Sequence, residues 1–132
     1  MTHTHPIRVY YEDTDLAGIV YYANYLKFIE RARSEWVRGL GVDQAVLKAE
    51  QGLVFAVRRV EADYLAPARF DDLLAVTTTP EAATPARLTL RQAVHRGDML
   101  LFGARVVLVC LDASARPRRF PAALRVLCTD HG

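Results

Sequence analysis

The sequence predicts an α+β fold in which an antiparallel sheet wraps around one long central helix. A short segment of period two opens the chain, a long amphipathic helical pattern follows it, and four strand-like segments then succeed one another. Consecutive strands joined by short turns favour antiparallel pairing. The apolar face of one helix must be buried against that sheet, and a curled sheet around the helix fits these lengths more economically than a helix on one flat face.

A short strand is expected near the N-terminus, over residues 7–12. Ile7, Val9 and Tyr11 alternate there with their neighbours, which is the period of two that a strand produces. Turn-forming residues at 13–18, among them two aspartates and a glycine, then interrupt the alternation. The chain is therefore expected to leave the sheet through a loop before its helical pattern begins.

The long helix is expected over residues 24–40, where apolar side chains recur at steps of three and four. A helix of this length spans roughly 25 Å, about the diameter of one small domain. Asn24 is the expected N-cap, and Gly39 and Gly41 are the expected stop signals. A second, shorter helix is expected over residues 42–51.

The remainder of the chain is expected to be mostly strand. Alternating or continuously apolar segments predict strands over residues 54–64, 73–79, 88–95 and 100–111. The intervening segments are interpreted as a connection at 66–72 and turns at 80–85 and 96–98. Two prolines then break the chain before a short terminal helix at 121–127.

The composition is that of one globular domain spanning residues 1–132. Of the 132 residues, 52% are hydrophobic and 24% charged, values that exclude wholesale disorder. Seventeen basic and 15 acidic residues give a net charge of +2, without the basic excess typical of a nucleic-acid-binding protein. No signal-peptide pattern opens the chain, and the longest apolar stretch is too short to span a bilayer. We therefore expect a cytoplasmic protein with no nucleic-acid partner and no membrane insertion.

Several common kinds of active site are absent from the sequence. Neither of the two serines lies in a G-x-S-x-G motif, and no P-loop or G-x-G-x-x-G motif occurs. No cysteine or histidine spacing matches a zinc site. We therefore expect neither a metal ion nor a cofactor.

The unusual segment is the loop that precedes the long helix. Asp13 and Asp15 leave a strand there and enter a glycine-containing loop, followed by an apolar run. A helix N-terminus offers unpaired N–H groups that can stabilise an oxyanion, and a nearby carboxylate can act as a general base or nucleophile. Two structural interpretations stay open: the aspartates form only an Asx-turn, and Tyr21, Tyr22 and Tyr25 are plain core residues.

The segment from Arg8 to Arg33, with its D-x-D-x-x-G-I-V block, resembles the Tol-Pal-associated, YbgC-like acyl-CoA thioesterases. These belong to the 4-hydroxybenzoyl-CoA thioesterase family of hotdog-fold proteins. The resemblance continues through residues 57–59, 64–72 and 106–112 and covers nearly the whole chain. It implies a hotdog fold and hydrolysis of a small, aliphatic or aromatic acyl-CoA.

The resemblance also implies roles for individual residues. The family's catalytic carboxylate falls on Asp15, which would act as a base on water or attack the thioester directly. The backbone N–H that polarises the thioester carbonyl falls on Tyr22, and Tyr11 falls on a tyrosine of the YbgC-like active site. Gly18 would supply the turn that brings the loop to the helix. The resemblance further implies a site at a homodimer interface, with dimers often pairing into homotetramers.

Two departures from the family pattern concern the substrate. YbgC-like proteins usually carry histidine at the position of Tyr22, whereas the aryl-CoA branch carries an aromatic residue there. That branch also has a basic cluster near residues 84–87, of which only Arg87 is basic in this chain, so Arg87 is the candidate for binding CoA phosphates. Tyr25, with Phe28 and Ile29, is expected to line either the acyl pocket or only the core.

Two alternatives to thioester hydrolysis remain at this point. The absence of a histidine at Tyr22 is compatible with a module that binds acyl-CoA or an acyl-carrier protein with little turnover. A hotdog dehydratase would need a histidine–carboxylate pair, and no histidine lies between Tyr10 and Glu30. The dehydratase is therefore the weakest interpretation.

Overall fold

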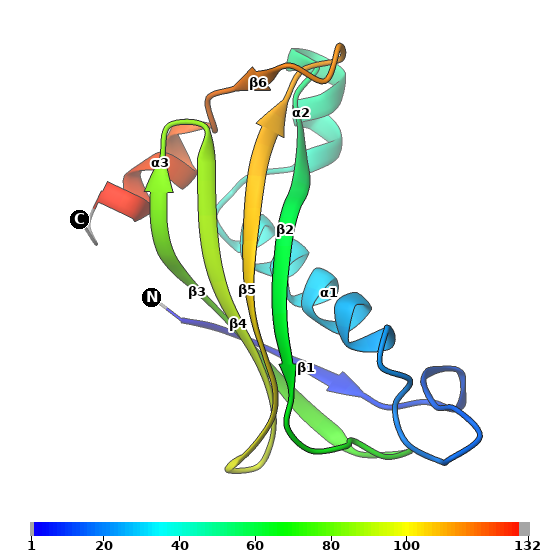
Figure 1. The fold of residues 1–132 in the computed structure, drawn as a ribbon. Helices are drawn as coiled ribbons and strands as arrows, with labels where there is room; N and C mark the ends of the chain where they lie inside the picture. The colour runs from blue at the N-terminus through cyan, green and yellow to red at the C-terminus, as the bar shows by residue number, and fades with distance from the viewer. Residues whose placement is uncertain (1, 130–132) are drawn as a thin grey trace.

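The computed structural model describes residues 2–129 and consists of one curved sheet with a long helix against one side (Figure 1). In chain order the elements are β1 (His3–Arg8), η1 (Tyr11–Asp13), α1 (Asn24–Gly39), α2 (Gln44–Gln51), β2 (Val54–Tyr64), β3 (Leu73–Thr84), β4 (Arg87–Arg96), β5 (Met99–Leu111), β6 (Pro117–Arg118) and α3 (Ala122–Thr129). Within these residues, no helix combines the length and the apolar character needed to cross a membrane.

The sheet is antiparallel throughout and has the strand order β1-β3-β4-β5-β2, with β6 paired to β5. Helix α1 packs most extensively against β1, β3 and β4, and β2 is the edge strand beyond β5. This confirms the predicted α+β arrangement of an antiparallel sheet around one long helix.

Helix α1 buries the apolar face that its sequence period predicts. Tyr25, Phe28, Ile29 and Trp36 are each less than 5% exposed and belong to the main hydrophobic core. The predicted N-cap is wrong by one residue: Ala23 is the N-cap, and Asn24 is the first helical residue. The side-chain amide of Asn24 donates to a carboxylate in the preceding loop, so this side chain does not cap the helix.

Strands β1 and β3 differ most from the prediction: β1 begins at His3, four residues earlier than expected, and the far ends of both strands differ for local reasons. Strand β1 ends at Arg8 because the next residues turn tightly: the Asp13 carboxylate accepts the Tyr10 N–H at 2.9 Å. Strand β3 continues to Thr84 instead of turning at residue 80. A register shift between β3 and β4 beyond Pro80 accommodates the proline, which has no N–H to donate to the ladder. The predicted turn at 80–85 is therefore wrong.

A buried polar cluster joins the middle of α1 to the sheet. Gln92 of β4 is fully buried, and its amide nitrogen donates to the Ile29 carbonyl and the Thr78 hydroxyl, each at 2.9 Å. Its amide oxygen accepts from the Arg33 guanidinium at 3.0 Å. Burial lowers the pKa of Arg33, with the neighbouring Glu30 opposing that shift. One side chain thus satisfies polar groups on α1 and β3 at once.

Candidate active site

The loop between β1 and α1 is held at both ends by one buried carboxylate, that of Asp13. Its Oδ2 accepts the Tyr10 N–H and its Oδ1 accepts the Asn24 side-chain amide, both at 2.9 Å. Its backbone carbonyl accepts the Tyr21 N–H at 2.9 Å. Asp13 is 3% exposed, so it acts as the anchor that fixes where the loop leaves β1 and where α1 begins.

The second aspartate of the loop, Asp15, is exposed at a tight turn. The Asp15 N–H donates to the Ile19 carbonyl at 2.9 Å, and the Gly18 N–H donates to the Asp15 carbonyl at 3.0 Å. Gly18 has φ +79°, a left-handed conformation that other L residues adopt only with strain. Asp15 Oδ1 accepts the Ala17 N–H at 2.9 Å, while Oδ2 has no hydrogen-bond partner within residues 2–129.

The connection from β2 to β3 lies directly against this loop. The Val20 N–H donates to the Ala68 carbonyl at 2.8 Å, and the Ala68 N–H donates to the Tyr25 hydroxyl at 3.0 Å. Burial raises the pKa of the Tyr25 phenol, and the Ala68 hydrogen bond only partly offsets this effect. The connection is therefore fastened to the loop by a backbone hydrogen bond and to the first turn of α1 by the Tyr25 side chain.

An ion pair fastens the far end of the same connection. Arg96 of β4 donates to Asp72 Oδ2 at 2.8 Å and to the Pro67 carbonyl at 3.3 Å. Burial alone would raise the pKa of Asp72, but the hydrogen bonds from the Arg69 N–H and from Arg96 outweigh it, so the pKa lies below its usual value. Asp72 thus stays ionised and keeps the connection in place.

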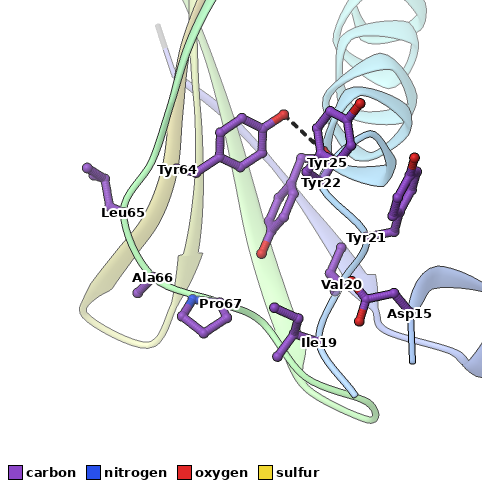
Figure 2. A pocket seen from close by; sticks show the side chains of 10 residues that line it. All are labelled: Asp15, Ile19, Val20, Tyr21, Tyr22, Tyr25, Tyr64, Leu65, Ala66 and Pro67. Carbon is purple, nitrogen blue, oxygen red and sulfur yellow. Dashed lines mark hydrogen bonds between the residues drawn. The ribbon is translucent and has the colours of Figure 1, made fainter. Parts of the chain in front are cut away.

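These segments enclose a pocket of about 410 Å³ at the N-terminus of α1 (Figure 2). Asp15 and Tyr22 line it from the loop, Tyr25 from α1, and Tyr64 and Leu65 from the end of β2 and the residue after it. The lining is mainly aromatic and aliphatic, with Asp15 as its one carboxylate among the residues that line it. Such a cavity suits an apolar group joined to a reactive polar one.

The N–H of Tyr22 is unpaired at the positive end of α1. Tyr22 directly precedes the N-cap residue Ala23, and the neighbouring Tyr21 N–H is already taken by the Asp13 carbonyl. Within residues 2–129, Tyr22 N–H has no acceptor. A helix N-terminus carries partial positive charge, so this donor is suited to an oxygen that gains negative charge.

Three of the predicted site residues lie together, and three do not. Asp15, Tyr22 and Tyr25 line the pocket, and Tyr25 is at the same time part of the core. Phe28 and Ile29, by contrast, belong to the core and do not line this pocket. Gly18 shapes the turn without lining the cavity.

Tyr11 and Arg87 lie outside the pocket. Tyr11 is 80% exposed and its ring stacks on that of Phe70 at 4.3 Å. Arg87 pairs with Val109 at the β3–β4 hairpin end of the sheet, whereas Tyr64 pairs with Phe102. Seven residues of strand separate these two levels, about 23 Å. Figure 1 shows that hairpin at the opposite end of the sheet from the loop before α1. The roles of Tyr11 and Arg87 stay predictions.

Tyr64 is one of the pocket residues that the sequence did not predict as site residues. Tyr64 ends β2, and its hydroxyl donates to the Tyr22 carbonyl oxygen at 2.9 Å across the pocket. The sequence period places Tyr64 on the inward phase of its strand, but no local signal points to a partner 42 residues earlier. Across the described part of the chain, no three His, Cys, Asp or Glu side chains gather as they would around a metal ion.

Comparison with known proteins gives consistent matches. Residues 17–107 match the family model described as the thioesterase superfamily. The acyl-CoA thioesterase YbgC of Haemophilus influenzae is 41% identical over 121 residues, which cover 91% of this chain and 89% of that protein. A probable thioesterase from Bartonella henselae is 36% identical, with a TM-score of 0.87 over 92% of this chain and 100% of that chain.

A third match is a variant of 4-hydroxybenzoyl CoA thioesterase in complex with 4-hydroxybenzoyl CoA. That structure is 25% identical, with a TM-score of 0.89 over 96% of this chain and 98% of that chain. The similarity to all three proteins extends over most of the chain.

Proposed function

Because this chain belongs to the thioesterase superfamily, we propose that it hydrolyses an acyl-CoA with Asp15 as general base or nucleophile and the Tyr22 N–H as oxyanion donor. The chain is a thioester hydrolase, as its relatives are. Their names support coenzyme A as the thiol carrier. The finer assignment rests on one observation: Asp15 and Tyr22 line the same pocket at the start of α1.

The chemistry needs no more than these two groups. A thioester is activated but uncharged, so its attack requires a nucleophile and a donor for the oxygen that becomes negative. As a base, Asp15 takes a proton from water while the water oxygen attacks the carbonyl carbon, and the tetrahedral intermediate then breaks its C–S bond and expels the thiolate. As a nucleophile, its carboxylate attacks that carbon, the thiolate leaves, and water cleaves the resulting anhydride. In both routes the Tyr22 N–H stabilises the oxyanion, a contribution of about 10²–10³ in rate in other enzymes.

The pocket's size and lining support a small aliphatic or aromatic acyl group as substrate. We expect thiol release from at least one acyl-CoA in a series of short aliphatic, long aliphatic and aromatic substrates, followed with a thiol reagent. We also expect the rate to be the same with and without EDTA. Saturable acyl-CoA binding without thiol release in any class would instead favour the acyl-CoA or acyl-carrier-protein binding module. Loss of activity on chelation, restored by a divalent metal, would contradict the metal-free mechanism.

We also propose that the protein is a homodimer or a dimer of dimers. Supporting this, the inward face of the edge strand β2 is only partly covered: Val57 is 46% exposed and Val60 39%, although both point to the same side as buried residues of β5. A second copy seated there would cover this apolar strip. It would also extend the wall of the pocket, which Tyr64 of the same strand lines.

Light scattering at micromolar concentration is expected to give the mass of two or four chains. Val57→Glu is expected to shift the protein to monomer, because an unpaired charge is costly to bury in an interface. Val46→Glu is the matched control, since Val46 on α2 is also 46% exposed but is not part of β2, and it is expected to keep the wild-type mass. A monomeric wild-type protein would overturn the assembly.

A further inference from the structure

The described part of the chain has one hydrogen bond between the edge strand β2 and the segment that carries the oxyanion donor. The Tyr64 hydroxyl donates it to the Tyr22 carbonyl oxygen at 2.9 Å (Figure 2). Figure 2 shows the Tyr64 side chain reaching from β2 toward the first turn of α1. This bond therefore ties the end of the sheet's edge strand to the start of the central helix.

The Tyr64 ring is held in the orientation that this bond requires. It packs edge-on against Phe102 at 5.0 Å and against Tyr25 at 5.6 Å, measured between ring centroids. The Tyr22 ring lies on its other flank at 6.2 Å, again edge-on. Burial raises the pKa of the Tyr64 phenol, and its tyrosine neighbours raise it further, so the hydroxyl remains a donor at neutral pH.

The helix does not itself satisfy the Tyr22 carbonyl. If α1 began at Tyr22 or earlier, this oxygen would accept the Leu26 N–H four residues later. In the structure the Leu26 N–H donates instead to the Ala23 carbonyl at 3.1 Å. Within residues 2–129, the Tyr64 hydroxyl is the partner that the Tyr22 carbonyl has. On the other side, the preceding N–H, that of Tyr21, is fixed by the Asp13 carbonyl. The Tyr22 N–H belongs to the Tyr21–Tyr22 peptide plane, whose carbonyl accepts the Asn24 N–H at 2.8 Å. The Tyr64 hydroxyl holds the next peptide plane, Tyr22–Ala23, so these bonds together limit how the Tyr22 N–H can rotate.

We propose that Tyr64 is a positioning residue for thioester hydrolysis: by holding the Tyr22 carbonyl, its hydroxyl keeps the Tyr22 N–H aimed at the developing oxyanion. This rests on the function proposed above, in which that N–H is the oxyanion donor. Tyr64 acts through Tyr22 and does not itself contact the reacting atoms. Because the oxyanion exists only along the reaction path, losing this alignment slows the chemical step more than it weakens substrate binding.

The test compares two substitutions at Tyr64. Tyr64→Phe removes only the hydroxyl and keeps the ring contacts with Phe102 and Tyr25. We expect kcat to fall about 10-fold, a fraction of the ~10²–10³ that loss of a complete oxyanion donor costs. The expected change in KM is less than about twofold, since an effect confined to the transition state lowers kcat and kcat/KM together. Tyr64→Leu also removes the ring from the pocket wall and is expected to raise KM as well.

The matched control is Tyr10→Phe, which makes the same chemical change at an exposed tyrosine outside the pocket and is expected to keep the wild-type kcat. Thermal unfolding of each variant is measured alongside the kinetics. A wild-type kcat for Tyr64→Phe would overturn the positioning role. So would a rise in KM alone, or a loss of activity that follows loss of folded protein at the assay temperature.

Failure of this inference is distinguishable from failure of the proposed function. If Asp15→Asn is inactive while Tyr64→Phe has wild-type kinetics, the hydrolysis mechanism stands and the positioning role falls. If Asp15→Asn itself turns over at the wild-type rate, the mechanism fails, and the role of Tyr64 fails with it.

Discussion

Replacing Asp15 with asparagine is expected to lower kcat for acyl-CoA hydrolysis by about 10³-fold, the middle of the range for loss of a general base. Asparagine is nearly the same size, and its amide oxygen still accepts the Ala17 N–H that Asp15 accepts at 2.9 Å. It can neither take a proton from water nor attack the thioester. The substitution therefore removes the chemistry and keeps the turn, so the melting temperature is expected to stay close to that of the wild type.

The measurement is steady-state thiol release with the best substrate found for the wild-type protein. Asp98→Asn, in the exposed β4–β5 turn, makes the same change away from the pocket and is the control for which wild-type activity is expected. Mass spectrometry of acid-quenched wild-type protein separates the two routes, since only nucleophilic attack leaves an acyl group on Asp15. Hydrolysis by the Asn variant at the wild-type rate would exclude both routes.

Replacing Gln92 with leucine is expected to lower the free energy of unfolding by about 3 kcal/mol, since each polar group left buried without a partner costs about 1–3 kcal/mol. Leucine fills a similar volume, but it removes the hydrogen bonds to Thr78, Ile29 and Arg33. The Thr78 hydroxyl is fully buried and loses its partner, and the partly buried Arg33 guanidinium loses its acceptor. The protein is expected to melt roughly 10 °C lower.

Thermal and urea unfolding measure this loss. Gln51→Leu, at the exposed end of α2, is the matched control and is expected to change stability by no more than about 0.5 kcal/mol. Adding Thr78→Val to Gln92→Leu removes the stranded hydroxyl and is expected to recover part of the loss. A melting temperature for Gln92→Leu equal to that of the control would contradict the importance of the cluster.

The secondary structure was largely predictable because each element has its own local period. The stripe that begins at Tyr25 predicted α1, and alternating or continuously apolar segments predicted the long strands. The boundaries that were wrong depend on contacts outside the local pattern. Asn24 does not cap α1 because its amide bonds to Asp13, 11 residues earlier, and β3 passes Pro80 because a register shift against β4 absorbs it.

The same contrast between local sequence signals and contacts distant in the sequence applies to the candidate site. Asp15 and Tyr22 lie within one short segment, where the sequence predicted a loop before a helix N-terminus, and the family resemblance implied the role of each. Tyr64 comes from a strand 42 residues later, and only the fold brings its hydroxyl to the Tyr22 carbonyl. Gln92 shares the inward phase of its strand with Leu90, so its position signals burial. The groups that form hydrogen bonds with Gln92 depend on how α1 packs against the sheet. No local sequence pattern carries that information.

Main-chain hydrogen bonds hold the loop beside the pocket in place, whereas side chains form much of the pocket's surface. Main-chain groups hold the loop to the connection, through the Val20–Ala68 hydrogen bond and the backbone pairing of Ile19 with Arg69. The side chain of Ile19, by contrast, lines the cavity. Substitutions at such positions reshape the cavity while the main-chain bonds remain. Acyl preference can therefore diverge among descendants of this chain by single replacements, without a matching loss of the scaffold that carries the reaction.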